Sequence, residues 1–175
     1  MKMWNKLKNW IGLNPLKEEK ENMDALFLDF DGVLHPVSGI GRMFSRGELL
    51  VPLFRKRKDV GIVISSDWRF GYDLEEMKRK LGVLGEYVIG QTPQIVDLSY
   101  RYFPGDDGVL FSRQREILWY LKSNPYIRNW VVVDDIPDLF EDVFREQHVV
   151  ITDCRKGITE EDVEKLDKQL DITPI

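Results

Sequence analysis

Short apolar runs alternate with amphipathic segments along the chain, and this alternation constrains the fold more than any other feature. Apolar runs at residues 25–28, 60–64, 87–89, 130–133 and 149–151 predict about five strands. Apolar residues at helical spacing predict helices over residues 47–58, 73–81, 113–123 and 159–170. Continuous apolar runs are typical of strands that are covered on both faces. We therefore expect an α/β fold, in which a mainly parallel sheet carries helices on both faces.

Length and composition favour one globular domain. The chain has 175 residues and is 43% hydrophobic, which is sufficient for a core. Its formal net charge of −5 argues against a broad basic surface for nucleic acid, but not against a local basic groove. The single cysteine, Cys154, excludes an intrachain disulfide framework and is consistent with the cytoplasmic location that we expect. No run reaches transmembrane length, so we expect no stable membrane insertion.

The first 23 residues form a separate segment before the domain, which we assign to residues 24–175. Four apolar residues recur there at helical spacing with lysines between them: Trp4, Leu7, Trp10 and Ile11. This pattern predicts an amphipathic extension. Its apolar face is short for a membrane-surface anchor, so packing on the domain or on a partner subunit is favoured over that alternative. The sequence leaves the oligomeric state open.

Reactive side chains follow three of the predicted strands, at the point where each apolar run ends. They are Asp29 and Asp31 after the first run, Ser65, Ser66 and Asp67 after the second, and Asp134, Asp135 and Asp138 after the fourth. Sites in parallel sheets lie beyond the carboxyl ends of the strands. Acids at two strand ends are suited to a metal ion, and hydroxyl and backbone N–H groups at the third are suited to an anion.

Asp29 and Asp31 are two acids one residue apart at a strand tip, followed by Gly32. Their carboxylates repel each other unless a divalent cation lies between them or one acid keeps its proton. Both arrangements suit phosphoryl transfer, in which one acid attacks phosphorus and the other moves a proton. Taken alone, the pair also fits a turn with solvated acids. A calcium loop fits poorly, because Val33 stands where that pattern needs another acid.

In the order of these motifs, the chain resembles the haloacid dehalogenase-like (HAD) phosphohydrolases. The family pattern is an apolar strand followed by Asp-x-Asp-Gly, a strand ending in Ser or Thr, a Lys or Arg before a later strand, and a strand ending in an acidic pair. All four motifs occur in this order between residues 25 and 151. The resemblance implies a Rossmann-like parallel sheet. The gaps between the motifs are too short for a large cap domain, so we expect an open site and a bulky phosphorylated substrate.

A finer resemblance is to the compact HAD domains of phage and bacterial proteins and of RNA-repair proteins. It rests on Gly90-Gln-Thr-Pro93, Arg113-x-x-Glu116-Ile117, the pair Asp134-Asp135 and Gly157-Ile-Thr159. This resemblance implies a nucleic-acid end or a nucleotide as the phosphorylated substrate.

The family resemblance also implies roles for individual residues. Asp29 would be the nucleophile that forms an aspartyl-phosphate, and Asp31 would protonate the leaving oxygen and then activate water. Ser65 would donate a hydrogen bond to the phosphoryl oxygens. A cation at the start of the helix over residues 113–123 would offset negative charge. Helical spacing places Arg113 and Arg115 on different faces, and the finer resemblance selects Arg113.

By the same resemblance, Mg²⁺ is the expected cofactor. It would be bound by the carboxylate of Asp29, the backbone carbonyl of Asp31, and Asp134 or Asp135, which are not expected to project in the same direction. The remaining candidates for substrate contact lie near the first two motifs: Gly32, Ser66, Trp68 and Arg69. The Trp68 ring is suited to stacking on a base, although packing at a helix start is an equal alternative.

Two other functions remain open at this point. Receiver domains use a similar acidic pair in phospho-acceptor signalling, but there the pair follows the first strand, whereas Asp134 and Asp135 come late in this chain. A catalytically silent binding module with the same fold is the second alternative. The presence of both Asp29 and Asp31 argues against a loss of chemistry.

Overall fold

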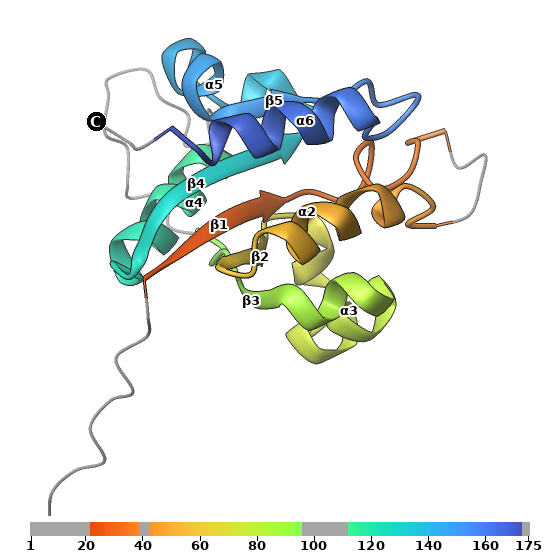
Figure 1. The fold of residues 1–175 in the computed structure, drawn as a ribbon, viewed down its shortest axis with the longest axis horizontal. Helices are drawn as coiled ribbons and strands as arrows, with labels where there is room; N and C mark the ends of the chain where they lie inside the picture. The colour runs from red at the N-terminus through yellow and green to blue at the C-terminus, as the bar shows by residue number, and fades with distance from the viewer. Residues whose placement is uncertain (1–21, 39–42, 96–111, 173–175) are drawn as a thin grey trace, which may run out of the picture.

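The computed structural model describes residues 22–38, 43–95 and 112–172, which form a five-stranded, all-parallel sheet with helices on both faces (Figure 1). The strands are β1 (Met23–Leu28), β2 (Val60–Ile64), β3 (Val88–Gln91), β4 (Ile127–Asp134) and β5 (Val149–Ile151). They lie in the order β3-β2-β1-β4-β5. The expected α/β, Rossmann-like fold is therefore confirmed, and the described part of the chain includes no cap domain. Residues 1–21 of the predicted N-terminal extension lie outside the described residues. Met23, which the prediction placed in the extension, is the first residue of β1.

Within the described residues, five α-helices connect and cover these strands. They are α2 (Val51–Lys56), α3 (Leu74–Leu81), α4 (Ser112–Ser123), α5 (Asp142–His148) and α6 (Glu160–Gln169). Four 3-10 turns accompany them in the described residues: η1 (Gly47–Leu50), η2 (Asp67–Phe70), η3 (Gly82–Tyr87) and η4 (Pro137–Leu139). The helix expected over residues 47–58 is divided into η1 and α2. Pro52, which lacks a backbone N–H, lies in the first turn of α2, where that group is not needed.

Two helices begin with side-chain caps. Asp73 caps α3 and Thr159 caps α6, and each makes a reciprocal capping box with the residue three positions later. Helix α5 was not predicted. It has only seven residues, and Phe144 is its one buried residue, which is too little for a helical pattern to be recognised.

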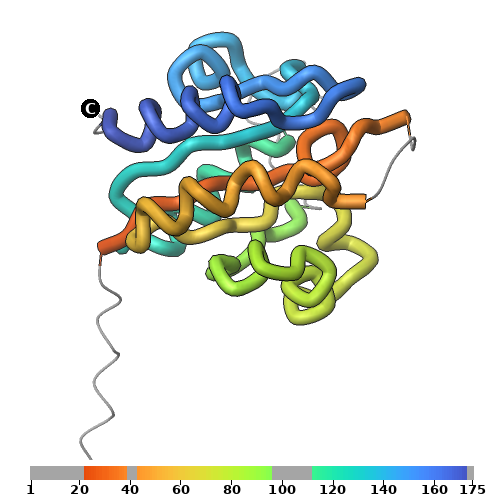
Figure 2. The backbone as a smooth tube through the Cα atoms, turned by 45° about the vertical axis from the view of Figure 1, so that its right-hand side comes forward, coloured from red at the N-terminus to blue at the C-terminus, as the bar shows by residue number. Residues whose placement is uncertain are grey.

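The core has two layers, one on each face of the sheet. Leu26 and Leu28 of β1 pack in the cluster that includes side chains of α2, α3 and α6. Ala25 and Phe27, which point to the other face, pack in the cluster that includes side chains of α4 and α5. In Figure 2 the backbone of β1 runs through the middle of the fold. No helix of the described residues has the length and apolar character needed to cross a membrane.

Candidate active site

The ends of three adjacent strands bring the candidate residues to one edge of the sheet. Leu28 of β1 is in register with Ile64 of β2 and with Val133 of β4. The next residue along each strand is therefore at the same level, which gives the trio Asp29, Ser65 and Asp134. Backbone hydrogen bonds continue the ladder here: the Asp29 N–H donates to the Val133 carbonyl at 3.1 Å, and the Ser65 N–H donates to the Leu28 carbonyl at 3.0 Å.

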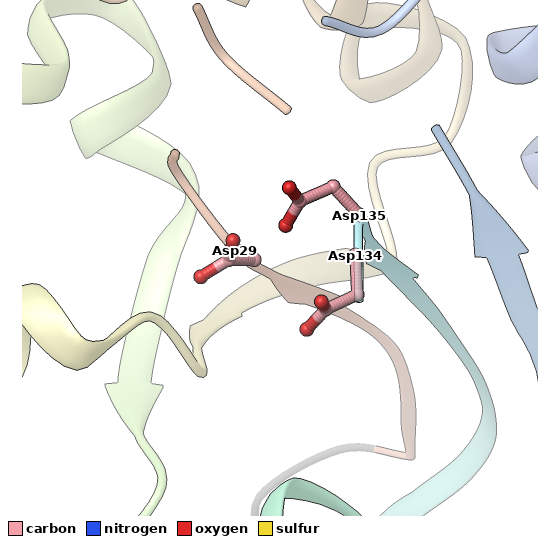
Figure 3. A group of neighbouring side chains, drawn as sticks. All are labelled: Asp29, Asp134 and Asp135. Carbon is pink, nitrogen blue, oxygen red and sulfur yellow. The ribbon is translucent and has the colours of Figure 1, made fainter. Parts of the chain in front are cut away.

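Three carboxylates meet at this edge: Asp29, Asp134 and Asp135 (Figure 3). One oxygen of each lies within 4.8 Å of the others. The expectation that Asp134 and Asp135 would not project the same way is wrong, because both reach Asp29. Asp134 is the last residue of β4 and the chain turns immediately after it, with the Ile136 N–H donating to Asp134 Oδ1 at 2.9 Å.

Arg113, in the first turn of α4, lies against this acidic cluster. Its Nη1 donates to Asp29 Oδ1 at 2.9 Å and to Asp134 Oδ2 at 3.0 Å, and its Nη2 donates to Asp67 Oδ1 at 3.2 Å. The guanidinium is buried, as are Asp29 and Asp134. Arg113 therefore bridges acids from the ends of β1 and β4, and it also contacts the segment that follows β2.

The electrostatics of the acidic cluster favour a further cation. Burial raises the pKa of Asp29, and it raises the pKa of Asp134 to about 7, with Arg113 opposing both shifts. Burial and the charge of Asp29 also raise the pKa of Asp135. One guanidinium faces three carboxylates, so the cluster has excess negative charge when all three are ionised. Buried carboxylate oxygens at this spacing fit a hard divalent cation such as Mg²⁺.

The loop at residue 32 approaches the acidic cluster so closely that only glycine fits at this position. Its φ of 70° lies in the left-handed region, and a Cβ at this position would lie 2.2 Å from Asp135 Oδ2. The Thr152 hydroxyl donates to the Gly32 carbonyl at 2.8 Å and fixes the loop from β5. The structure thus gives Gly32 a packing role beside Asp135, and its contact with substrate stays a prediction.

Asp31 directs its side chain to a different set of partners. Asp31 Oδ2 accepts a hydrogen bond from the Trp68 indole N–H at 2.8 Å, and Oδ1 lies 3.0 Å from His35 Nε2. Its side chain is 53% exposed, in contrast to the buried Asp29. The Asp31 carboxylate does not belong to the acidic cluster, and the predicted contact of its backbone carbonyl with a metal stays a prediction.

Buried hydroxyl groups line the neighbouring strand ends. Oγ of Ser65, which follows β2, and Oγ1 of Thr92, which follows β3, have no hydrogen-bond partner among the described residues. The Ser66 hydroxyl is also buried and interacts with Asp29, whose pKa it lowers. A buried hydroxyl without a partner is unfavourable by about 1–3 kcal/mol, so such groups usually have a function or a missing ligand. Hydroxyl donors beside a cluster of acids and one arginine suit the oxygens of a phosphoryl group.

Comparison with known families agrees with this geometry. A family model described as the HAD domain in Swiss Army Knife RNA repair proteins matches residues 25–163. The chain belongs to this family. The match includes every candidate site residue, and it indicates a phosphohydrolase-type function. Comparisons with curated proteins and with solved structures found no match.

In this HAD domain, Arg69 joins the segment after β2 to helix α4. Its Nη2 forms a buried ion pair with the carboxylate of Glu116, and its Nη1 donates to the Ser65 carbonyl at 2.5 Å. Asp67 lies between the two arginines, accepting from both Arg69 and Arg113. The contact of Arg69 with substrate stays a prediction. The sequence did not reveal the pair with Glu116, because the two residues are 47 positions apart.

Trp68 combines a polar contact with exposed aromatic surface. Its indole N–H binds Asp31, and its ring stacks on Tyr72 with 5.5 Å between the ring centroids. Tyr72 is 38% exposed, and Lys80 Nζ lies 4.3 Å from the centre of its ring. An aromatic and basic surface therefore borders Asp31 on the outside of the site.

Proposed function

We propose that this HAD domain is an Mg²⁺-dependent phosphomonoester hydrolase that acts through an aspartyl-phosphate on Asp29. The main support is the convergence of the three carboxylates with the buried Arg113 at the carboxyl edge of the sheet. The buried hydroxyls of Ser65 and Ser66 at the same edge add donors for phosphoryl oxygens. The proposed nucleophile and these donors follow β1 and β2, and the counter-charge of Arg113 comes from the first turn of α4.

In the proposed reaction, a carboxylate oxygen of Asp29 attacks phosphorus, and the bond from phosphorus to the leaving oxygen breaks. The leaving oxygen keeps the bonding electron pair and takes a proton from Asp31. Water then attacks the phosphorus of the aspartyl-phosphate and gives its proton to Asp31. The bond from phosphorus to Asp29 breaks, which releases inorganic phosphate and restores both acids.

Asp29, Asp134 and Asp135 would bind Mg²⁺ in this proposal. When bound, Mg²⁺ supplies positive charge that offsets the cluster of carboxylates and the phosphoryl oxygens. Arg113 contributes from the protein side, because its Nη1 already donates to both Asp29 and Asp134. Its pKa is raised despite burial, since the charges of Asp134 and Asp29 outweigh desolvation, and it therefore stays charged throughout.

The proposed substrate is bulky, such as the phosphorylated end of a nucleic acid or a nucleotide. The described residues contribute no cap domain to this edge, and Asp31 is accessible from outside. Trp68 and Tyr72 add an aromatic surface beside Asp31, which suits stacking of a base, and Lys80 suits a phosphate of the backbone. The family description, which refers to RNA repair proteins, supports the same class of substrate.

Phosphate release from p-nitrophenyl phosphate, with Mg²⁺ and after chelation, tests the activity. We expect turnover that requires Mg²⁺ and that is abolished by Asp29→Asn with the fold intact. Asp59→Asn is the matched control, because Asp59 lies before β2, at the opposite edge of the sheet, with a side chain that is 55% exposed. Full activity of Asp29→Asn would remove the nucleophile assignment. Complete inactivity of the wild-type chain would favour a silent binding module.

A panel of 3′- and 5′-phosphorylated oligonucleotides, nucleotides, sugar phosphates and phosphopeptides tests the substrate. We expect the highest kcat/KM for an oligonucleotide end. A strong preference for a free sugar phosphate over every nucleotide and oligomer would contradict the open-site argument.

A further inference from the structure

Each carboxylate oxygen of Asp31 lies at a ring nitrogen of an aromatic side chain. Trp68 Nε1 lies 2.8 Å from Oδ2, and His35 Nε2 lies 3.0 Å from Oδ1. We infer that Trp68 and His35 are positioning residues that fix the Asp31 carboxyl group for proton transfer to the leaving oxygen. This inference rests on the proposed function, because it assigns a purpose to contacts of the proposed acid.

The chemistry of the two rings makes both of them donors to Asp31. An indole N–H donates and cannot accept, so the contact from Trp68 has only one direction. His35 Nδ1 is buried and has no partner among the described residues. A carboxylate oxygen only accepts, so at 3.0 Å from Asp31 Oδ1 the hydrogen of this contact lies on His35 Nε2, which donates.

Two donors on two different oxygens fix the orientation of the carboxyl group. Rotation about the Cβ–Cγ bond of Asp31 would break both hydrogen bonds at once. Each carboxylate oxygen nevertheless keeps a second lone-pair site, which is sufficient for the proton that is transferred. The two rings thus restrict the direction of Asp31 while they leave its acid–base function available.

The two rings are themselves fixed by an aromatic cluster. The Trp68 ring contacts four others, with centroid distances between 5.2 and 6.3 Å: Phe30, His35, Phe44 and Tyr72. Phe44 has a φ of 56°, a left-handed conformation that is uncommon for a bulky residue. This conformation is strained, and the packing of the Phe44 ring on His35, Phe30 and Trp68 offsets the strain.

Substrates with different leaving groups can show whether Trp68 and His35 position the acid or only stabilise the structure. p-Nitrophenolate is stable as an anion and leaves with little help from an acid, whereas an alkoxide needs a proton. Asp31 also accepts a proton in the second step, which is common to all substrates, so kcat/KM is the readout, because it reports the formation of the aspartyl-phosphate alone. A misplaced Asp31 therefore lowers kcat/KM for an alkyl phosphate and has little effect on kcat/KM for p-nitrophenyl phosphate. Damage to the nucleophile or to the metal site would slow both substrates together.

Trp68→Phe is the direct test, because it removes the N–H group and keeps an aromatic ring in the cluster. We expect the ratio of kcat/KM for an alkyl phosphate to kcat/KM for p-nitrophenyl phosphate to fall by about tenfold or more, which is part of the roughly 10²–10⁴-fold that general acid catalysis supplies. Loss of a substrate contact at Trp68 would instead lower both values together and leave their ratio unchanged. Trp119→Phe, at a position on α4 that is 53% exposed, is the control and is expected to change neither value.

His35 provides an independent pair of variants. The side-chain amide of His35→Gln can place an N–H near the position of Nε2, whereas His35→Leu removes the donor. We expect His35→Gln to retain most alkyl phosphatase activity and His35→Leu to lose it selectively. Equal losses on both substrates, or no loss on the alkyl phosphate, would overturn the inference. A wild-type protein that hydrolyses neither substrate would instead contradict the proposed function, and this inference with it.

Discussion

Replacing Asp134 with asparagine is expected to stabilise the metal-free protein at neutral pH, although Asp134 lies at the centre of the site. Burial raises the pKa of Asp134 to about 7, against an ordinary value of 3.8. The folded state therefore binds this proton more tightly than the unfolded state, and the free energy of unfolding falls as the pH rises from about 4 to about 7. Each pH unit in that range is worth about 1.36 kcal/mol, so the ionised Asp134 destabilises the fold by up to about 4 kcal/mol at pH 7.5.

Asp134→Asn removes the destabilisation by the ionised carboxylate, but it also weakens the hydrogen bonds made at this position. Only one of its two side-chain oxygens remains to accept from Arg113 and the Ile136 N–H. A hydrogen bond to a charged group is worth about 2 kcal/mol, which leaves a net gain in the free energy of unfolding of about 2 kcal/mol at pH 7.5. At pH 4 the carboxyl group is protonated in the folded state and about 40% protonated in the unfolded state, so its effect on the free energy of unfolding is below about 1 kcal/mol and the gain disappears.

Urea unfolding at pH 4.5 and pH 7.5 in the presence of a chelator measures this difference. The readout is the difference between wild type and Asp134→Asn, because other groups such as Asp153 and Asp167, whose pKa values are lowered by hydrogen bonds, titrate equally in both proteins. Mg²⁺ at pH 7.5 is expected to stabilise wild type more than the variant. A variant that is less stable than wild type at pH 7.5 without Mg²⁺, or a difference that does not change with pH, would refute the reasoning.

Two further substitutions test how the site is supported. Glu116→Gln removes the buried ion-pair partner of Arg69 and leaves only the exposed carboxylate of Asp67 beside it, so the free energy of unfolding is expected to fall by about 3 kcal/mol in urea titrations; a change below about 1 kcal/mol would show that the pair is not important for stability. Gly32→Ala places a Cβ against Asp135 and is expected to lower phosphatase kcat at least about tenfold, whereas the control Gly82→Ala, with a φ of 59° and nothing within 4 Å of the added carbon, is expected to cost only about 1 kcal/mol of stability. Equal activity of the two alanine variants would show that the approach to Asp135 is not critical.

The fold was predictable because its signals are local. Strands that are buried on both faces leave continuous apolar runs, and the residue after each run necessarily lies at the carboxyl edge of a parallel sheet. The positions of Asp29, Ser65 and Asp134 at one edge follow directly from this rule and from the strand order β2-β1-β4. Helix α5 was missed because seven residues with a single buried side chain carry no clear period.

The contacts within the site were less predictable because they depend on side-chain directions across the fold. The Arg69–Glu116 pair joins two elements that only tertiary packing brings together. Asp135 reaches the acidic cluster because the chain turns after β4, and strand alternation alone argued against this. The contact of His35 with Asp31 depends on the conformation of the turn between them, which no local pattern in the sequence specifies.

Direct detection of a phosphorylated Asp29 tests the central claim. During turnover with Mg²⁺, borohydride reduces an acyl-phosphate to an alcohol, and mass spectrometry of the digested protein then locates the reduced residue. We predict reduction at Asp29 that requires both substrate and Mg²⁺ and that is absent from Asp29→Asn. Continued phosphate release with no reduction at Asp29, or with reduction at another aspartate, would contradict the account.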